Sequence, residues 1–296
     1  MDISQDELEF KWLAAAESYE ASILFSKDRG TPLAESWQKI GFCYSLASKQ
    51  AREQEDFKKI RQQAVHAYQK AAKLFGENSD PKSKGESSKC YSLAEYKQSW
   101  IASNPQEKDA HLQKCYNFGK EAITFFNKAK DEKNSGITFN ILAQCLFDRI
   151  YLSLVESEKK EFVQEGIEFS NDAISIFEKL EIKEDLVVAL FLATLHYWYL
   201  ANIGENEAIR KDSSEKCLEY SEKTLKLSQE LNNPYVIAKS YWARTLATSF
   251  FTDDLKSSLN YAKQMLEQAS TVRDTYIQGI AYYFLAFITD LMIPSE

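Results

Sequence analysis

The sequence predicts an all-α protein, and three observations lead to this class. Glycine (9) and proline (5) are scarce in a chain of 296 residues, and the interiors of helices tolerate few of either. Apolar residues make up 44% of the chain and recur along most of it at the spacing of amphipathic helices. A string of the form A-x3-[FY]-x2-A also recurs, which indicates that similar pairs of helices stack on one another.

The first helix is expected over residues 6–27. Its apolar positions fall near one face at helical spacing; they are Trp12, Leu13, Ala16, Tyr19 and Leu24. The segment from Arg29 to Pro32 should end this helix. Thr31 is the expected N-cap of the next helix, with Pro32 at its first position.

Turn-forming residues divide the rest of the chain. Residues 76–88 combine Gly, Pro, Ser and Asp without apolar periodicity, and they predict a loop. Asn104-Pro105, Ser135-Gly136 and Asn232–Pro234 predict further breaks. The remaining helices are therefore expected at about 32–50, 55–75, 87–102, 107–130, 139–146, 160–180, 185–201, 211–230, 234–250, 254–270 and 273–291.

Two strings mark the clearest pair of helices. Residues 37–44 read W-Q-K-I-G-F-C-Y, and A-V-H-A-Y-Q-K-A begins at Ala64. They match W-x2-L-G-x2-Y, with Ile40 for leucine, and A-x3-[FY]-x2-A, so the pair resembles a tetratricopeptide repeat (TPR). The resemblance implies a single TPR-like domain over residues 1–296. Its expected form is a right-handed superhelical solenoid of about twelve helices in about six antiparallel hairpins.

The second string is the part of the motif that recurs most clearly. Its anchor positions are Ala64, Ala122, Ala173, Ser221 and Ala262. Their separations of 58, 51, 48 and 41 residues exceed the roughly 34 residues of a standard repeat. The helices or their connections are therefore expected to be longer than in that family. Related helical-hairpin arrays, such as the SNAP-type adaptors of vesicle fusion, stay open as an alternative.

The charge and the cysteines narrow the expected partners and compartment. The formal net charge is −8, and most basic residues are lysines; an acidic chain repels phosphate backbones, so nucleic acid is not an expected partner. The five cysteines are widely spaced and none forms C-x2-C, so we expect buried, reduced side chains in a cytoplasmic protein.

No targeting or membrane segment is expected. The first eight residues carry several acids and no basic region, unlike a secretory signal. No apolar run of about eighteen residues lacks a charge. Residues 277–290 come closest to a membrane span, but this run is too short.

Catalysis receives little support from the sequence. The three histidines, His66, His111 and His196, are far apart. The chain contains no G-x-S-x-G, H-E-x-x-H, Walker loop or G-x-G-x-x-G. We therefore expect no enzyme, and neither catalytic residues, metal ligands nor a cofactor.

The TPR resemblance predicts where a partner would bind. In that family the first helix of each hairpin lines the concave groove, and groove residues lie between the packing positions. Carried over to the clear motif at 37–44 and to its softer copy at Phe139, these positions include Gln38, Phe42, Asn140, Gln144 and Phe147. The basic-plus-Asn clamp that some members use for C-terminal carboxylates would need Lys at Gln38 and Asn at Phe42. Because neither is present, that function is not carried over.

The expected function is a scaffold or adaptor that binds a peptide or helix of another protein in its concave groove. The alternative is a helical sensor domain or enzyme with a small-molecule pocket between helices near Trp198. This residue belongs to the run His196-Tyr197-Trp198-Tyr199, in a helix that is apolar almost all round. Such a helix is either core or faces a partner.

The last helix has apolar side chains on every side. Residues 277–293 read I-Q-G-I-A-Y-Y-F-L-A-F-I-T-D-L-M-I, whereas a terminal helix of a solenoid normally has a polar outer face. Two explanations are open if neighbouring helices do not cover it. Either the natural protein continues past Glu296, so that the array is the docking arm of a larger regulatory protein, or this end forms a homodimer.

Overall fold

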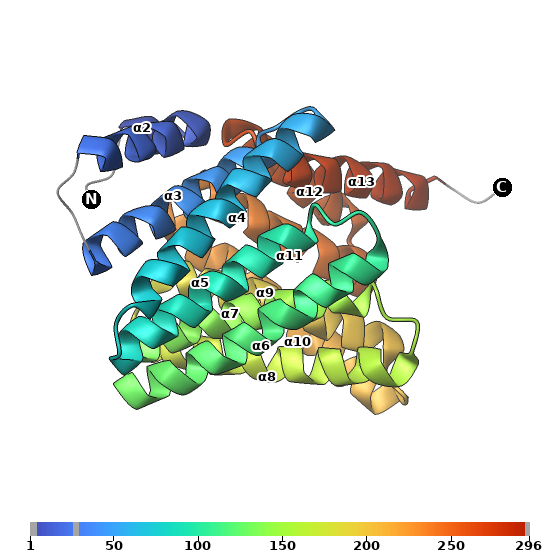
Figure 1. The fold of residues 1–296 in the computed structure, drawn as a ribbon. Coiled ribbons are helices and arrows are strands. Elements are labelled where there is room, and N and C mark those ends of the chain that lie inside the picture. The colour runs from blue at the N-terminus through green and yellow to red at the C-terminus, as the bar shows by residue number, and fades with distance from the viewer. Residues whose placement is uncertain (1–4, 26–29, 294–296) are drawn as a thin grey trace. The chain divides into compact units, whose positions relative to one another are not determined.

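The structure is a computed structural model, and it describes residues 5–25 and 30–293. The described residues form thirteen α-helices (Figure 1). The helices are α1 (Gln5–Leu8), α2 (Trp12–Phe25), α3 (Thr31–Lys49), α4 (Gln54–Gly76), α5 (Pro81–Ser99), α6 (Pro105–Ala129), α7 (Glu132–Ile150), α8 (Glu156–Lys179), α9 (Lys183–Ile203), α10 (Glu207–Leu231), α11 (Pro234–Phe251), α12 (Leu255–Thr271) and α13 (Thr275–Leu291). The all-α class is therefore confirmed.

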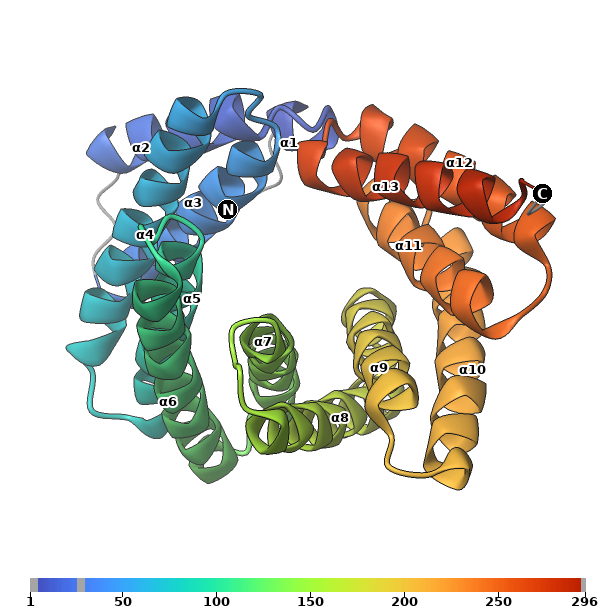
Figure 2. The same ribbon diagram turned by 90° about the vertical axis from the view of Figure 1, so that its right-hand side faces the viewer.

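The chain forms two compact units, Met1–Cys145 and Leu146–Glu296, with the boundary inside α7. Within each unit, helices that follow one another in sequence pack side by side, as α5 and α6 or α9 and α10 do in Figure 2. The odd-numbered helices also contact one another: α3 touches α5 in the first unit, and α11 touches both α9 and α13 in the second. Each unit is thus an array of helices that pack on their neighbours in sequence, and in the second unit α9, α11 and α13 form one continuous layer.

The alanine-based string marks the core of this array. All five predicted anchors, Ala64, Ala122, Ala173, Ser221 and Ala262, have no exposed surface. Four of them are alanine and one is serine, and small side chains at buried positions let neighbouring helices pack closely. The five cysteines are likewise free and buried, as predicted.

The expected first helix is interrupted. Phe10 has a φ of 56°, in the left-handed region that breaks a right-handed helix, so α1 and α2 replace one helix over 6–27. Leu13 and Leu24 are exposed rather than buried. Residues 26–29, including Arg29, lie outside the described residues. The helix count is thirteen rather than twelve because α1 is separate.

The N-cap of α3 differs by one residue from the prediction. Gly30 is the N-cap, with a φ of 60°, and no side chain caps the first turn. Thr31 is instead the first residue of the helix. Gly30 fits this position because only glycine adopts such a backbone at little cost.

The predicted loop at 76–88 is wrong. α4 runs to Gly76 and α5 already begins at Pro81. Asp80 caps α5 by accepting a hydrogen bond from the Ser83 backbone N–H at 2.9 Å. The small residues of this segment serve close packing instead: a Cβ on Gly85 would lie 2.6 Å from the ring of Phe126.

Two other predicted boundaries also moved. Ser135 and Gly136 lie inside α7 rather than at a turn, because Lys130, with a φ of 56°, ends α6 in the left-handed conformation. The helix expected at 160–180 begins four residues earlier, at Glu156.

Candidate protein-interaction surfaces

Gln38 lies in a chain of polar side chains that crosses the odd-numbered helices of the first unit. Its Nε2 donates a hydrogen bond to Oε2 of Glu86 on α5, at 3.1 Å. Glu86 pairs with Lys89 at 2.8 Å, and the Lys89 ammonium donates to Oδ1 of Asn134 on α7 at 2.7 Å. We call Gln38, Glu86, Lys89 and Asn134 the polar belt.

The charges of the polar belt are almost fully buried. The side chains of Lys89 and Glu86 are only 6% and 11% exposed. Burying a charged pair is tolerated when hydrogen bonds satisfy both ions, and Gln38 and Asn134 supply those bonds. Because the bonds join α3, α5 and α7, the polar belt can fix how these helices align.

Phe42 is strongly exposed, at 45%. Its ring meets the edge of Trp12 at a centroid distance of 5.9 Å, and the Lys39 ammonium lies 5.7 Å from its centre. Trp12 is the first residue of α2. The predicted groove position is therefore accessible, but it borders the N-terminal part of the same chain.

The three predicted residues of α7 are less accessible. Asn140 and Phe147 are buried and Gln144 is half-buried. Phe147 lies in the second unit, where its ring packs on Tyr151 at 5.4 Å and on His196 at 5.5 Å. The structure thus places Gln38 and Phe42 on α3 and the other three on α7.

Aromatic side chains form a continuous row on the odd-numbered helices of the second unit. Trp198 of α9 meets Phe250 of α11 edge-on at 5.4 Å. Phe250 stacks on Phe287 of α13 at 5.5 Å, and Phe287 stacks on Tyr283 at 6.1 Å. We call these four side chains the Phe250 row.

A second set of rings crosses the same helices nearer their N-terminal ends. Phe191, Trp242 and Tyr276 contact one another in that order, at 5.0 and 6.0 Å. Tyr276 is exposed. The odd-numbered layer of the second unit is therefore rich in aromatic surface along much of its length.

The Phe250 row is open to solvent at two of its members. Phe250 is 38% exposed and Tyr283 is 59% exposed. Rings of this kind combine large apolar area with few rotatable bonds, and they are common anchors of protein interfaces. The sequence indicates Trp198 through its aromatic neighbours, whereas its periodicity does not predict that Phe250 and Tyr283 join the same row.

Tyr151 borders this aromatic region at the end of α7. Its ring lies 6.1 Å from that of Tyr199. The residue is 60% exposed, but partial desolvation by the groups packed around its hydroxyl, with Tyr199, Tyr276 and Asp148 adding to it, raises the pKa of that hydroxyl above its usual value. Its hydroxyl therefore stays protonated and can donate a hydrogen bond at neutral pH.

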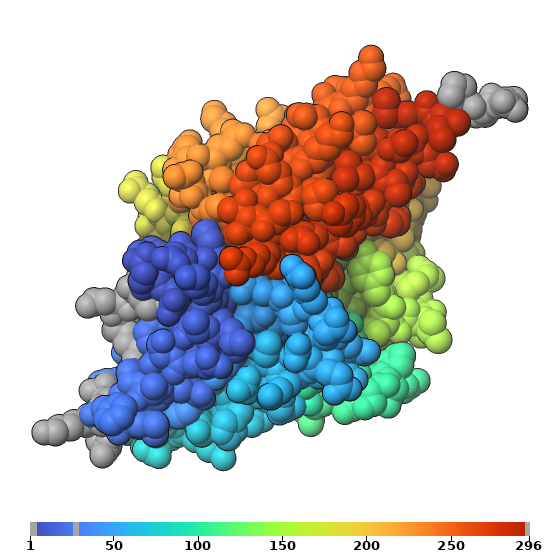
Figure 3. All heavy atoms as spheres, turned by 90° about the horizontal axis from the view of Figure 1, so that it is seen from above, coloured from blue at the N-terminus to red at the C-terminus, as the bar shows by residue number. Residues whose placement is uncertain are grey.

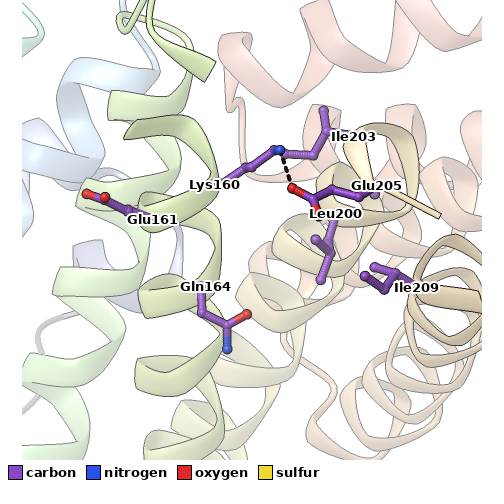
Figure 4. Close-up of a pocket in the computed structure, with 8 residues that line it drawn as sticks. Lys160, Glu161, Gln164, Leu200, Ile203, Glu205 and Ile209 are labelled. Carbon is purple, nitrogen blue, oxygen red and sulfur yellow. Dashed lines mark hydrogen bonds and ion pairs between the residues drawn. The ribbon is translucent and has the colours of Figure 1, made fainter. Parts of the chain in front are cut away.

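A cavity of about 320 Å³ lies elsewhere in the second unit, at the C-terminal end of α9 (Figure 4). Leu200, Ile203 and Ile209 give it an apolar lining. Lys160 and Glu205 close a 2.6 Å ion pair at its edge. Trp198, near which the sequence predicted a pocket, is not part of its lining.

The described residues can be examined for a metal site and for a catalytic pair of side chains. No group of three or more His, Cys, Asp and Glu side chains in them could hold a metal ion. The nearest approach to a catalytic pair is His111, whose Nδ1 lies 2.6 Å from Oε2 of Glu95. Both side chains are about one-fifth exposed, and the other ring nitrogen of His111, Nε2, lies 3.9 Å from Oε1 of Glu107.

α9, rather than residues 277–290, comes closest to a membrane span. By length and composition it is the one helix of the described residues that could cross a membrane, with a mean hydropathy of 1.6 over its most apolar window. In the structure 61% of that window is buried inside the protein, which is the environment of a core helix.

Comparison with models of known protein families gives no match for this chain, and no curated protein matches its sequence.

Proposed function

We propose that this chain is a non-enzymatic scaffold or adaptor that binds a peptide or helix of another protein on its odd-numbered helices. The Phe250 row is the observation that carries the proposal. A row of rings on three alternate helices, α9, α11 and α13, exposed at Phe250 and Tyr283, is an apolar surface of the kind that marks interaction sites.

The shape and chemistry of the row favour an apolar helix face or an extended peptide with apolar side chains. All four members of the row are aromatic, so affinity would come from burial of rings rather than from ion pairs. Gln38, Phe42, Asn140, Gln144 and Phe147 stay a second predicted set of contacts, in which Phe42 is the most accessible.

The finer features of the fold belong to the same proposal. We infer that the hairpins of each unit stack into a right-handed, TPR-like superhelix, a proposal supported by the packing of consecutive helices within each unit. We also propose a cytoplasmic location, supported by five cysteines that are free and buried.

Photo-crosslinking tests the proposed surface. A p-benzoylphenylalanine side chain would replace Phe250 or Tyr283, and the matched control would replace Lys263, an exposed residue of the even-numbered helix α12. We expect one partner to crosslink from the first two positions and not from Lys263. Crosslinks from Lys263 alone would exclude the odd-numbered layer as the binding surface.

A small-molecule sensor or enzyme is the second candidate. Two observations favour it: the cavity at the end of α9, and the indole N–H of Trp198, which is buried without a hydrogen-bond partner among the described residues. A thermal-shift screen of metabolites and nucleotides separates the candidates. A hit that Leu200→Trp abolishes would favour the sensor, because that substitution fills the cavity.

A second copy of the chain is a candidate partner for the C-terminal end of α13. Met292 and Ile293 are exposed apolar residues there. If this end forms a homodimer, light scattering should give twice the 34.1 kDa of the chain, and Ile293→Lys should restore the monomer. A monomer at all concentrations would exclude the dimer.

A further inference from the structure

The carboxylate of Glu7 lies in a pocket formed by two other helices. Glu7 belongs to α1 and is only 6% exposed. Its Oε2 accepts a hydrogen bond from the Tyr19 hydroxyl of α2, and its Oε1 lies 2.6 Å from the Lys39 ammonium of α3. The thiol of Cys43 is 4.0 Å from the same oxygen. We call Tyr19, Lys39 and Cys43 the carboxylate pocket.

The pocket is built to receive a negative charge. Lys39 supplies a cation, and Tyr19 supplies a hydroxyl that donates to the other oxygen. Charge-assisted hydrogen bonds of this kind are stronger than neutral ones. Tyr19 and Cys43 are buried, whereas the Lys39 side chain is 32% exposed, so the pocket reaches solvent at Lys39.

The segment that fills the pocket consists of residues 5–12; we call it the strap, and several of its features indicate that it is weakly held. α1 is four residues long, which is too short for a helix to be stable by itself. Leu8 is exposed, and Phe10 holds a left-handed backbone that is costly for a bulky residue. In Figure 3 the N-terminal residues, in dark blue, lie at the surface of the molecule.

Two further contacts of the strap indicate which groups a ligand of this pocket would need besides a carboxylate. Gln50 of α3 donates to the Phe10 carbonyl at 2.8 Å, which is a bond that any extended peptide could make. Trp12 lies against Phe42. The strap therefore presents a carboxylate followed five residues later by an aromatic ring, in the string E-L-E-F-K-W from Glu7 to Trp12.

We propose that the carboxylate pocket is a docking site for an acidic peptide of a partner protein, and that α1 is its internal competitor. The partner would place a Glu or Asp side chain against Lys39 and Tyr19, and an aromatic side chain near Phe42. This inference rests on the proposed scaffold function and names the partner chemistry at Phe42, one of its predicted groove residues.

A labelled peptide tests the proposal on the full chain. The probe is a fluorescein-labelled peptide with the sequence of residues 5–12, titrated against the wild type and the Glu7→Gln variant by fluorescence anisotropy. We expect Glu7→Gln to bind the peptide at least tenfold more tightly than the wild type, because its own strap no longer fills the pocket with a charge. A control peptide with Gln in place of Glu7 should bind at least tenfold more weakly.

Two further variants connect the binding to Lys39. On the Glu7→Gln background, Lys39→Met should lower the affinity at least tenfold, whereas Lys39→Arg should keep it within about threefold, since arginine also pairs with carboxylates. Circular dichroism would establish that both variants keep the helical fold. Equal binding by the Met and Arg variants would overturn the proposal.

Hydrogen exchange of α1 completes the test. The amides of α1 should exchange faster in Glu7→Gln than in the wild type. Unchanged protection of α1, equal binding of the two peptides, or no binding to a variant whose α1 is released would each overturn the inference. Crosslinks from Phe250 and Tyr283 report on the second unit, so the scaffold function can stand when this inference fails.

Discussion

Gly41 of α3 lies directly against the ring of Tyr68 on α4. A Cβ atom on this glycine would stand 3.0 Å from two of the ring carbons. Tyr68 is buried, so the surrounding side chains leave its ring little space to shift away from an added atom. The glycine is needed here for the close approach of two helices and not for an unusual backbone.

Replacing Gly41 by leucine should therefore destabilise the protein by about 1–3 kcal/mol or more through overpacking. Gly279 of α13 is the matched control, because nothing lies within 4 Å of a Cβ there. Gly279→Leu should gain up to about 1 kcal/mol from helix propensity. Denaturant midpoints measure both effects, and equal midpoints for the two variants would show that the α3–α4 packing is wrong.

Tyr68 and Phe126 should be large contributors to stability. Both rings are buried against glycines, Gly41 and Gly85. Truncating either ring to alanine should lower the free energy of unfolding by about 3–5 kcal/mol, because a buried cavity is left. Phe42→Ala, at an exposed ring, serves as the control and should cost much less. Losses of the same size for all three would contradict the assigned burial.

These rings also show what the sequence could and could not predict. The string A-x3-[FY]-x2-A identified the buried anchors because close packing of helices needs small residues at these positions. Their spacing within one helix can be recognised in the sequence. The segment 76–88 misled because its serines and glycines have the composition of a loop, although they serve close contacts such as Gly85 with Phe126. The left-handed backbones of Phe10 and Lys130 have no signal in residue type.

The candidate surfaces were harder to predict than the fold. The motif register gave Phe42, which is exposed, but also Asn140 and Phe147, which are buried. Phe250 and Tyr283 are far apart in the chain and join one row only when α11 and α13 stack. Contacts of this range cannot be read from periodicity, because it describes one helix at a time.

The ion pair of the polar belt should show strong coupling. Lys89→Met alone leaves the Glu86 carboxylate buried without its cation, which should cost roughly 3–5 kcal/mol. The double variant Glu86→Met, Lys89→Met removes both charges and should recover much of this loss. Denaturant unfolding of the wild type, both single variants and the double variant gives the coupling energy. Additive losses would contradict a buried, mutually dependent pair.

The buried thiols should make the protein less stable at high pH. Burial raises the pKa of Cys90 from 9.0 to about 12, and burial together with the Glu7 charge raises the pKa of Cys43 to about 12. Above pH 9 the unfolded chain loses these protons while the folded chain keeps them, so unfolding is favoured as pH rises.

The melting temperature should accordingly fall as the pH is raised from 9 towards 11. Cys90→Ala removes one of these groups, so its melting temperature should fall less steeply over this range than that of the wild type. The quantity to compare is the slope of melting temperature against pH, because the substitution can also change the stability by the same amount at every pH. Parallel curves for the two proteins would show that the Cys90 thiol is not shielded from ionisation.

The central claim is that the Phe250 row binds the partner, and two neighbouring tyrosines test it most directly. Tyr283 and Tyr282 are similarly exposed, at 59% and 61%. Tyr283 stacks on Phe287 in the row. Tyr282 points to a different side of α13, because adjacent residues of a helix are about 100° apart. The measurement is the affinity of the crosslinked partner for each alanine variant by titration calorimetry. We predict that Tyr283→Ala weakens binding at least tenfold and that Tyr282→Ala leaves it within about twofold; equal losses, or a loss only with Tyr282→Ala, would contradict the account.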